Sequence, residues 1–176
     1  MITIREAQPG ELAAAGELTA AVYRDESLAE ATYLPRLADA AARHAADGAW
    51  QLIAVDEAGT LVGAAVYTVA GSEFADIASG TEAEIRMLAT AGSARGQGVG
   101  AALVLDCVRR TREDKRPALV LSTKPQMTAA QRLYTRLGFA RTPERDWEYA
   151  PGKGLLTFRL VIDSVSIESG MPALIS

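Results

Sequence analysis

The most informative stretch of this sequence is Arg95-Gly96-Gln97-Gly98-Val99-Gly100. The segment before it, residues 84–89, alternates polar and apolar side chains as a β-strand does. The segment after it repeats apolar side chains at helical spacing at Leu103, Val104, Cys107 and Val108. The pattern therefore predicts a strand, a glycine-rich turn and a helix in succession.

The glycines favour an anion site at the start of this helix. Glycine has no Cβ atom, so a ligand can approach its main chain closely. The free N–H groups of the first helical turn and the helix dipole favour a phosphate at that position. Arg95 adds a positive charge and several donors that match phosphate oxygens.

Other glycine-rich loops fit the stretch less well. A Walker-type loop needs Lys-Ser or Lys-Thr after its last glycine, and this chain has Ala101-Ala102. Residues 96–101 formally satisfy a dinucleotide-binding fingerprint, but residues 90–95 separate it from the strand, and the next strand, 118–122, does not end in an acid. The dinucleotide site and a purely structural turn stay open as alternatives.

A second motif supports one identification. Residues 127–139 place Ala130, Leu133-Tyr134 and Leu137-Gly138-Phe139 at the spacing of an Asn-x-x-Ala-x-x-Leu-Tyr helix that ends in Leu-Gly-Phe. Together with Arg-x-x-Gly-x-Gly at residues 95–100, this pattern resembles the acyl-CoA-binding motifs of the GCN5-related N-acetyltransferase (GNAT) superfamily, over roughly residues 2–161. Two positions depart from the family: Met127 replaces the usual Asn, and Thr90-Ala91-Gly92 replaces Val-Asp-Pro.

The resemblance implies an α/β fold with a mixed, mostly antiparallel twisted sheet and helices on both faces. We expect one domain over residues 1–162 and a C-terminal extension, 163–176, that is a tail, an extra strand or a dimer contact. The patterns predict strands at 2–5, 50–55, 61–70, 84–89, 118–123, 139–141 and 155–161. They predict helices at 11–23, at 31–46 with a break near Pro35, after the glycine turn, and around Tyr134, with loops at 71–81 and 142–154.

The resemblance also implies acetyl-CoA as the acyl donor. The residues that would hold its pyrophosphate are Arg95, Gly96, Gln97, Gly98, Val99 and Gly100. The main chain of Leu88, Ala89 and Thr90 would bind the pantetheine arm and polarise the thioester carbonyl. No grouping of His, Cys and carboxylate residues has the spacing of a metal site, so no metal is expected.

Tyr134 and Glu84 are the candidate catalytic residues. The family transfers the acetyl group by direct attack in a ternary complex, and Tyr134 corresponds to the tyrosine that many members place beside the sulfur of coenzyme A. Tyr134 also lies on an apolar helical stripe, so a core aromatic is the alternative. Strand alternation places Glu82, Glu84, Arg86 and Leu88 on one face. Glu84 is then a general base or the partner of a basic residue such as Arg86 or Arg132.

The acceptor side is the part that the sequence specifies least. The family uses the two N-terminal helices and the loop before the last strand there, which offer Tyr23, Tyr33, Asp146 and Trp147 as substrate-binding residues. Acids and aromatic rings can hold an amine by charge and by cation–π contact. The predicted acceptor is therefore an amine of a small molecule or a peptide.

Composition limits the class of protein. The chain has 176 residues, 49% of them apolar, and a net charge of −4, as in an ordinary soluble domain. This charge gives no reason to expect nucleic acid or an anionic membrane as a partner. The lone Cys107, which we expect to be packed rather than nucleophilic, and the lack of a signal peptide favour the cytoplasm. A homodimer and a non-catalytic acyl-CoA-binding module remain open.

Overall fold

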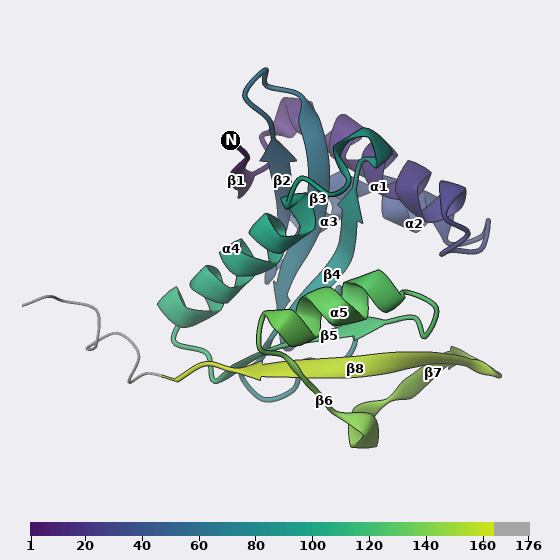
Figure 1. Cartoon of the computed structure of the whole chain (residues 1–176), viewed down its shortest axis with the longest axis vertical. Coiled ribbons are helices and arrows are strands. Elements are labelled where there is room, and N and C mark those ends of the chain that lie inside the picture. The colour runs from purple at the N-terminus through teal and green to yellow at the C-terminus, as the bar shows by residue number, and fades with distance from the viewer. Residues whose placement is uncertain (164–176) are drawn as a thin grey trace, which may run out of the picture.

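The computed structural model describes residues 1–163 and shows one sheet with helices on both faces (Figure 1). Its strands are β1 (Thr3–Glu6), β2 (Ala49–Val55), β3 (Leu61–Val69), β4 (Ala83–Thr90), β5 (Ala118–Thr123), β6 (Ala140–Arg141), β7 (Trp147–Ala150) and β8 (Lys153–Val161). The order is β1-β2-β3-β4-β5-β8-β6, with β7 paired to β8. Neighbours are antiparallel except β4 and β5. The predicted mixed, mostly antiparallel sheet is confirmed, whereas the predicted extension lies almost entirely outside the described residues.

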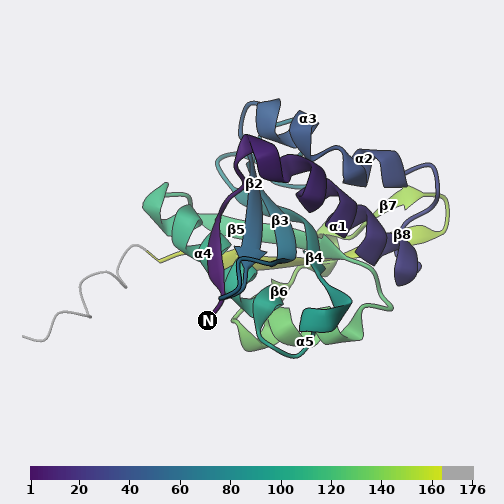
Figure 2. The same ribbon diagram turned by 90° about the horizontal axis from the view of Figure 1, so that it is seen from above.

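Five helices cover the two faces of the sheet (Figure 2). They are α1 (Leu12–Asp25), α2 (Leu34–Ala38), α3 (Ala40–Ala45), α4 (Val99–Glu113) and α5 (Thr128–Arg136). Helices α4 and α5 pack on one face over the largest apolar cluster, which includes Leu103, Leu119 and Tyr134. Helices α1 to α3 cover the other face over two smaller clusters. Within residues 1–163 no helix is long and apolar enough to cross a bilayer.

The second helical segment breaks at a different residue from the one predicted. Pro35 lies in the first turn of α2, where main-chain N–H groups make no hydrogen bond within the helix. The lack of an N–H group on proline therefore costs nothing there, and Pro35 starts the helix instead of breaking it. The break falls at Asp39, whose ψ of 69° is not helical. The Asp39 carboxylate accepts the Ala42 N–H at 2.9 Å and caps α3.

The segment predicted as a loop at 142–154 contains strand β7, so that prediction was wrong. Strand β7 pairs with β8 around a tight turn at Pro151-Gly152, where Gly152 has a φ of 73°. A proline followed by a glycine in the left-handed region is the signature of a type II turn. This turn brings Trp147 and Tyr149 back beside β8.

Strand β4 contains a bulge, so its side chains do not alternate along the whole strand as predicted. Its partner β3 pairs Ala64 with Ala89 and Val66 with Arg86, so two β4 residues, 87 and 88, face one β3 residue. Met87 has a φ of 53°, which is unusual for a residue with a side chain. As a result Met87 packs in the core under α2, and Leu88 points to the opposite core under α4.

Helix α1 packs so closely against the end of α2 that Gly16 has no room for a methyl group. A Cβ atom added at Gly16 would lie 1.9 Å from the main-chain oxygen of Ala38. We predict that Gly16→Ala lowers the free energy of unfolding by about 2 kcal/mol, despite the better helix propensity of alanine. Urea denaturation measures the change. Gly10→Ala is the control, since nothing lies within 4 Å of that position; equal stabilities of the two variants would contradict the prediction.

Candidate functional site

A cavity opens where β4 and β5 separate. The two parallel strands pair only through Ala83–Leu119, Glu84–Val120 and Ile85–Leu121, and beyond Ile85 strand β4 has no β5 partner. In Figure 1, β5 and β8 turn across the lower end of the upright strands β2 to β4. The cavity has a volume of about 600 Å³, the size of a small-molecule site. Its walls come from the α1–α2 segment, the ends of β4 and β5, α5, and the β7–β8 hairpin.

The glycine turn leaves open space and free donors at the start of α4. Gly96 and Gly98 have φ angles of 74° and 79°, and a Cβ atom on either would meet nothing within 4 Å. Within the described chain, the main-chain N–H groups of residues 96–101 have no hydrogen-bond partner, while that of Ala102 already bonds to Gly98. A Cβ atom added at Gly100 would make ordinary contacts, 3.6 Å from the Leu133 side chain and 3.7 Å from the Thr90 hydroxyl. The predicted anion cradle therefore has both the space and the donors it needs.

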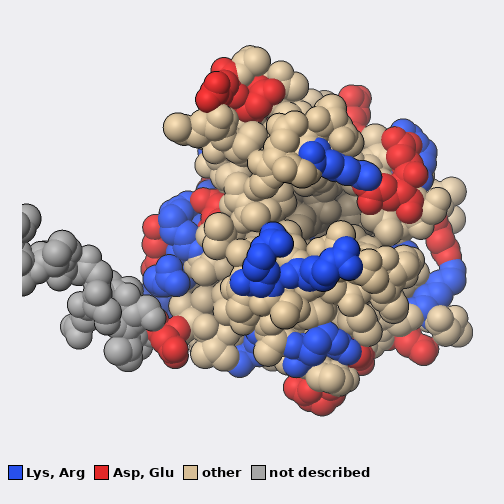
Figure 3. Space-filling model, viewed as in Figure 1, with Lys and Arg blue, Asp and Glu red and all other residues tan. Residues whose placement is uncertain are grey.

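Arg95 lies at the same turn, and in this structure its guanidinium forms an ion pair with Glu26 at the end of α1. Basic side chains also lie over α5, which carries Arg132 and Arg136. Figure 3 shows a hollow in the surface above α5 with basic side chains on both of its sides. This arrangement gives the hollow a positive border, which favours phosphate groups.

Tyr134 lines the cavity, although its ring is part of the core. The ring packs against Phe139 and Phe158 at centroid distances of 5.9 and 5.8 Å, and only 4% of the residue is exposed. Its hydroxyl forms no hydrogen bond to another described residue. Burial raises the pKa of Tyr134, so its phenol is protonated at neutral pH. Tyr134 therefore packs in the core and also lines the cavity, so its two predicted roles, core aromatic and catalytic residue, do not exclude each other.

Three of the four predicted acceptor residues, Tyr23, Tyr33 and Trp147, line the cavity together with Tyr134. Burial raises the pKa of Tyr23 to about 12, so this phenol is also neutral. The indole of Trp147 donates to the Ser122 hydroxyl at 3.0 Å and fixes β7 to the end of β5. With Tyr134 and Tyr149, these residues give the cavity wall several aromatic rings.

Asp146 does not line the cavity, in contrast to the prediction. Its carboxylate accepts two bonds from Arg141 at 2.8 Å and one from the Thr157 N–H at 2.8 Å. The bond from Arg141, outweighing partial burial, lowers the pKa of Asp146 to about 2. Asp146 joins β6 to β8, and its carboxylate is paired with Arg141 outside the cavity.

The cavity wall contains five charged residues that the sequence analysis did not select as site residues, and two of them, Arg86 and Asp76, form an ion pair. Arg86 forms an ion pair with Asp76 at 2.9 Å and donates to the Tyr33 hydroxyl at 3.1 Å. It also donates to the main-chain oxygen of Phe74 at 2.5 Å. Strand alternation predicted that Arg86 and Glu84 lie on the same face of β4. The structure shows that the partner of Arg86 comes from the loop after β3.

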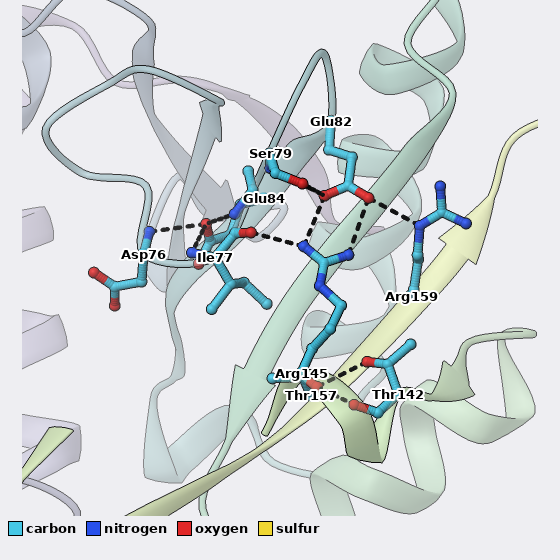
Figure 4. A network of polar contacts seen from close by, with 10 residues as sticks. Asp76, Ile77, Ser79, Glu82, Glu84, Thr142, Arg145, Thr157 and Arg159 are labelled. Carbon is cyan, nitrogen blue, oxygen red and sulfur yellow. Dashed lines mark hydrogen bonds and ion pairs between the residues drawn. The ribbon is translucent and has the colours of Figure 1, made fainter. Parts of the chain in front are cut away.

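Glu84 is fully buried and is absent from the cavity wall. Its Oε2 atom accepts the main-chain N–H groups of Asp76, Ile77 and Ala78 at 2.9, 2.9 and 3.0 Å (Figure 4). Burial is the largest effect on the Glu84 pKa and raises it, while these bonds act in the opposite direction. The contacts support an anchor for the loop that carries Asp76, and the predicted role as a base stays untested.

Glu82 connects the same loop to the far end of the sheet (Figure 4). Its carboxylate accepts two bonds from Arg145 at 3.0 and 2.9 Å and one from Arg159 at 2.9 Å. Arg145 also donates to the Ile77 oxygen at 2.7 Å. This network holds the loop, β4, β8 and the segment before β7 together, and so it fixes three walls of the cavity.

Cys107 lies away from the cavity, in the core under α4. Its side chain is fully buried, and burial raises the pKa of the thiol. A buried neutral thiol is a poor nucleophile. The position supports the prediction that Cys107 is a packing residue.

Comparisons with known proteins give a consistent result. The model of the acetyltransferase (GNAT) family matches residues 15–139. A GCN5-related N-acetyltransferase from Kribbella flavida is 23% identical, with 92% of this chain and 98% of that chain covered and a TM-score of 0.68. Arabidopsis thaliana NAA60, in complex with a bisubstrate analogue, is 20% identical, with 93% and 99% covered and a TM-score of 0.65. A Salmonella typhimurium protein with its cofactor acetyl-CoA is 22% identical, with 99% of each chain covered and a TM-score of 0.63. The search of curated proteins gives no match.

The Glu82 network makes a testable contribution to stability. Burial alone would raise the pKa of Glu82, but the bonds from Arg145, Ser79 and Arg159 outweigh it and lower the pKa to about 2, from an ordinary value of 4.5. We predict that Glu82→Gln lowers the free energy of unfolding by about 3 kcal/mol at pH 7. Because the lowered pKa stabilises the fold above pH 4.5, the deficit should shrink as the pH falls from 4.5 towards 2.

Chemical denaturation across this pH range tests the prediction. Glu113→Gln is the matched control, since Glu113 pairs with Arg109 on the exposed face of α4 and is 59% exposed. Its loss should cost at most about 0.5 kcal/mol. A Glu82→Gln deficit that is small, or that stays constant with pH, would contradict the assignment.

Proposed function

Because the chain belongs to the GNAT acetyltransferase family, we propose that it transfers an acetyl group from acetyl-CoA to the amine of a small molecule or peptide. The observation that carries the proposal is the separation of β4 from β5 beside a glycine turn with unpaired N–H groups. The cavity at this separation is lined by Tyr134, by Leu88 of the predicted pantetheine segment and by Tyr23, Tyr33 and Trp147, whereas residues 95–100 of the glycine turn lie outside its lining.

The residues present fit acetyl-CoA. The open space over Gly96 and Gly98 and the free N–H groups of residues 96–101 suit the two phosphates of its pyrophosphate. Arg95 would exchange its Glu26 partner for these phosphates. Beyond Ile85 the edge of β4 that faces β5 is unpaired, so the main chain of residues 88–90 is available to the pantetheine arm. Bound there, acetyl-CoA supplies the thioester that accepts the amine.

In this proposal Tyr134 is the general acid. The amine nitrogen forms a bond to the acetyl carbon, the carbon–sulfur bond breaks, and the sulfur takes the Tyr134 proton. The proton that the amine nitrogen loses returns to the phenolate through water. Burial favours the neutral phenol, so Tyr134 is protonated at neutral pH and has a proton to donate.

The main chain at the β4 bulge would polarise the thioester carbonyl. Fixed N–H donors act without reorganising when negative charge develops on an oxygen. Met127, at the position of the family's Asn, lines the cavity and makes this part of the wall apolar. Glu84 acts here as an anchor, so amine deprotonation by water is the pathway that fits the observed contacts.

Acetyl-CoA binding is the first test. We predict that Gly98→Val weakens binding at least ~30-fold, because a side chain fills the cradle and strains a residue with a φ of 79°. Arg95→Ala should weaken it about 10-fold, the effect of one charged hydrogen bond. Calorimetry measures both. The control Gly59→Val replaces a glycine with a φ of 81° in the distant β2–β3 turn, where nothing lies within 4 Å. An equal effect at Gly59, or no binding by the parent protein, would reject the donor site.

The second test concerns the Tyr134 hydroxyl. Tyr134→Phe keeps the ring but removes the proton donor, so we predict that kcat falls about 100-fold or more while acetyl-CoA affinity changes little. Thiol release with a panel of amines measures the rate. Tyr67→Phe is the control, because its hydroxyl donates to Asp114 at 3.0 Å outside the cavity. A parent protein that binds acetyl-CoA but never releases thiol would favour the non-catalytic binding module.

A further inference from the structure

The charges in the cavity wall do not match a simple cationic amine. The wall contains three basic residues, Arg36, Arg86 and Lys124, and two acidic residues, Glu30 and Asp76. Asp76 is paired with Arg86, and Glu30 is paired with Lys153. Both carboxylates are therefore already neutralised by a neighbouring cation.

Two cations of the wall are left with no carboxylate partner. Within residues 1–163, Arg36 and Lys124 form no ion pair; each lies instead over an aromatic ring. The Arg36 guanidinium is 4.9 Å from the centroid of Phe74, and the Lys124 ammonium is 5.3 Å from that of Tyr149. A ring face holds a cation in place without neutralising it. Each cation is thus free to pair with an anion in the cavity.

Arg36 is also held on a fixed part of the main chain. The fully buried Arg43 donates to the Arg36 oxygen at 2.8 Å and to the Leu37 oxygen at 2.9 Å. The same guanidinium donates to Gln51 of β2 at 2.8 Å. Helix α2 is thereby tied to the sheet, and the Arg36 side chain starts from a fixed position at the cavity wall.

We propose that the acceptor is a small amine that also carries a carboxylate, of the size of a single amino acid, and that Arg36 and Lys124 bind this carboxylate. The proposal rests on the proposed function and names its substrate class. A wall with an excess of unpaired positive charge repels an ammonium group unless the same molecule brings an anion. The volume of about 600 Å³ must also hold the acetyl end of the donor, which leaves room for a small acceptor only.

The test compares amino acids with their carboxamides, which keep the shape and lose the charge. For the parent protein, kcat/KM with acetyl-CoA should be at least ~10-fold higher for the acid of each pair, the worth of a charged hydrogen bond. Arg36→Gln and Lys124→Gln should each bring this ratio towards 1. Comparing the ratio between proteins cancels the different intrinsic reactivities of the two amines. Arg24→Gln is the control, because Arg24 is exposed on α1 and absent from the wall.

A binding measurement separates this inference from the proposed function. Calorimetry with N-acetylated amino acids and their carboxamides, in the presence of coenzyme A, needs no turnover. Acid-selective binding without turnover would keep the inference and reject the proposed function. Turnover or binding that treats acid and amide alike, or an acid preference that both Gln variants retain, would overturn the inference. A preference for peptides with an amidated C-terminus would overturn it as well.

Discussion

The separation of β4 from β5 after Ile85 is the constraint on which the rest of the site depends. A continuous sheet would pair the main-chain groups of β4 and leave neither a cavity nor free donors. Here the bulge at Met87 turns the strand and shifts its side chains, so that Met87 and Leu88 pack in opposite cores. The apolar clusters on both faces hold the strand in this unusual conformation.

Buried charges keep the separated strands in place. Glu84 of β4 and Glu82, the residue before β4, accept main-chain N–H groups of the loop after β3, and Arg43 ties α2 to β2. Each of these groups would be costly to bury without a partner. The bonds of Glu82 to Arg145 and Arg159 join residues 63 and 77 positions apart, while those of Glu84 and Arg43 reach residues six to eight positions away. Together they fix the loop, the hairpin and α2 as walls around the opening. The strained backbone at Met87 and these buried charges both help to hold β4 apart from β5.

The strand β4, the glycine turn and helix α4 could be predicted from the sequence because they are built from local patterns. Alternation, helical periodicity and the glycine spacing of residues 95–100 act over a few neighbouring residues, and all three gave the correct elements. The acceptor side was only partly predictable. Tyr23, Tyr33 and Trp147 do line the cavity, but Asp146 pairs with Arg141 instead. The bulge in β4 depends on pairing between strands, which no local pattern records, and the pairing of Arg86 with Asp76 depends on the path of the loop between β3 and β4. The β7–β8 hairpin is local, and its signal, the Pro151-Gly152 turn, is present in the sequence.

The predicted donor and acceptor sides differ in the kind of group that would contact a ligand. The predicted donor cradle consists of the main-chain N–H groups of residues 96–101, whose positions follow from the fold, together with the Arg95 side chain. The acceptor wall consists of side chains from α1, α2, β4, β5 and the β7–β8 hairpin. A substitution such as one at Arg36 or Lys124 alters the charge of that wall while leaving the cradle and Tyr134 intact. A change in the charge of this wall therefore leaves the glycine turn undisturbed, so the fold alone does not determine which molecule the cavity binds.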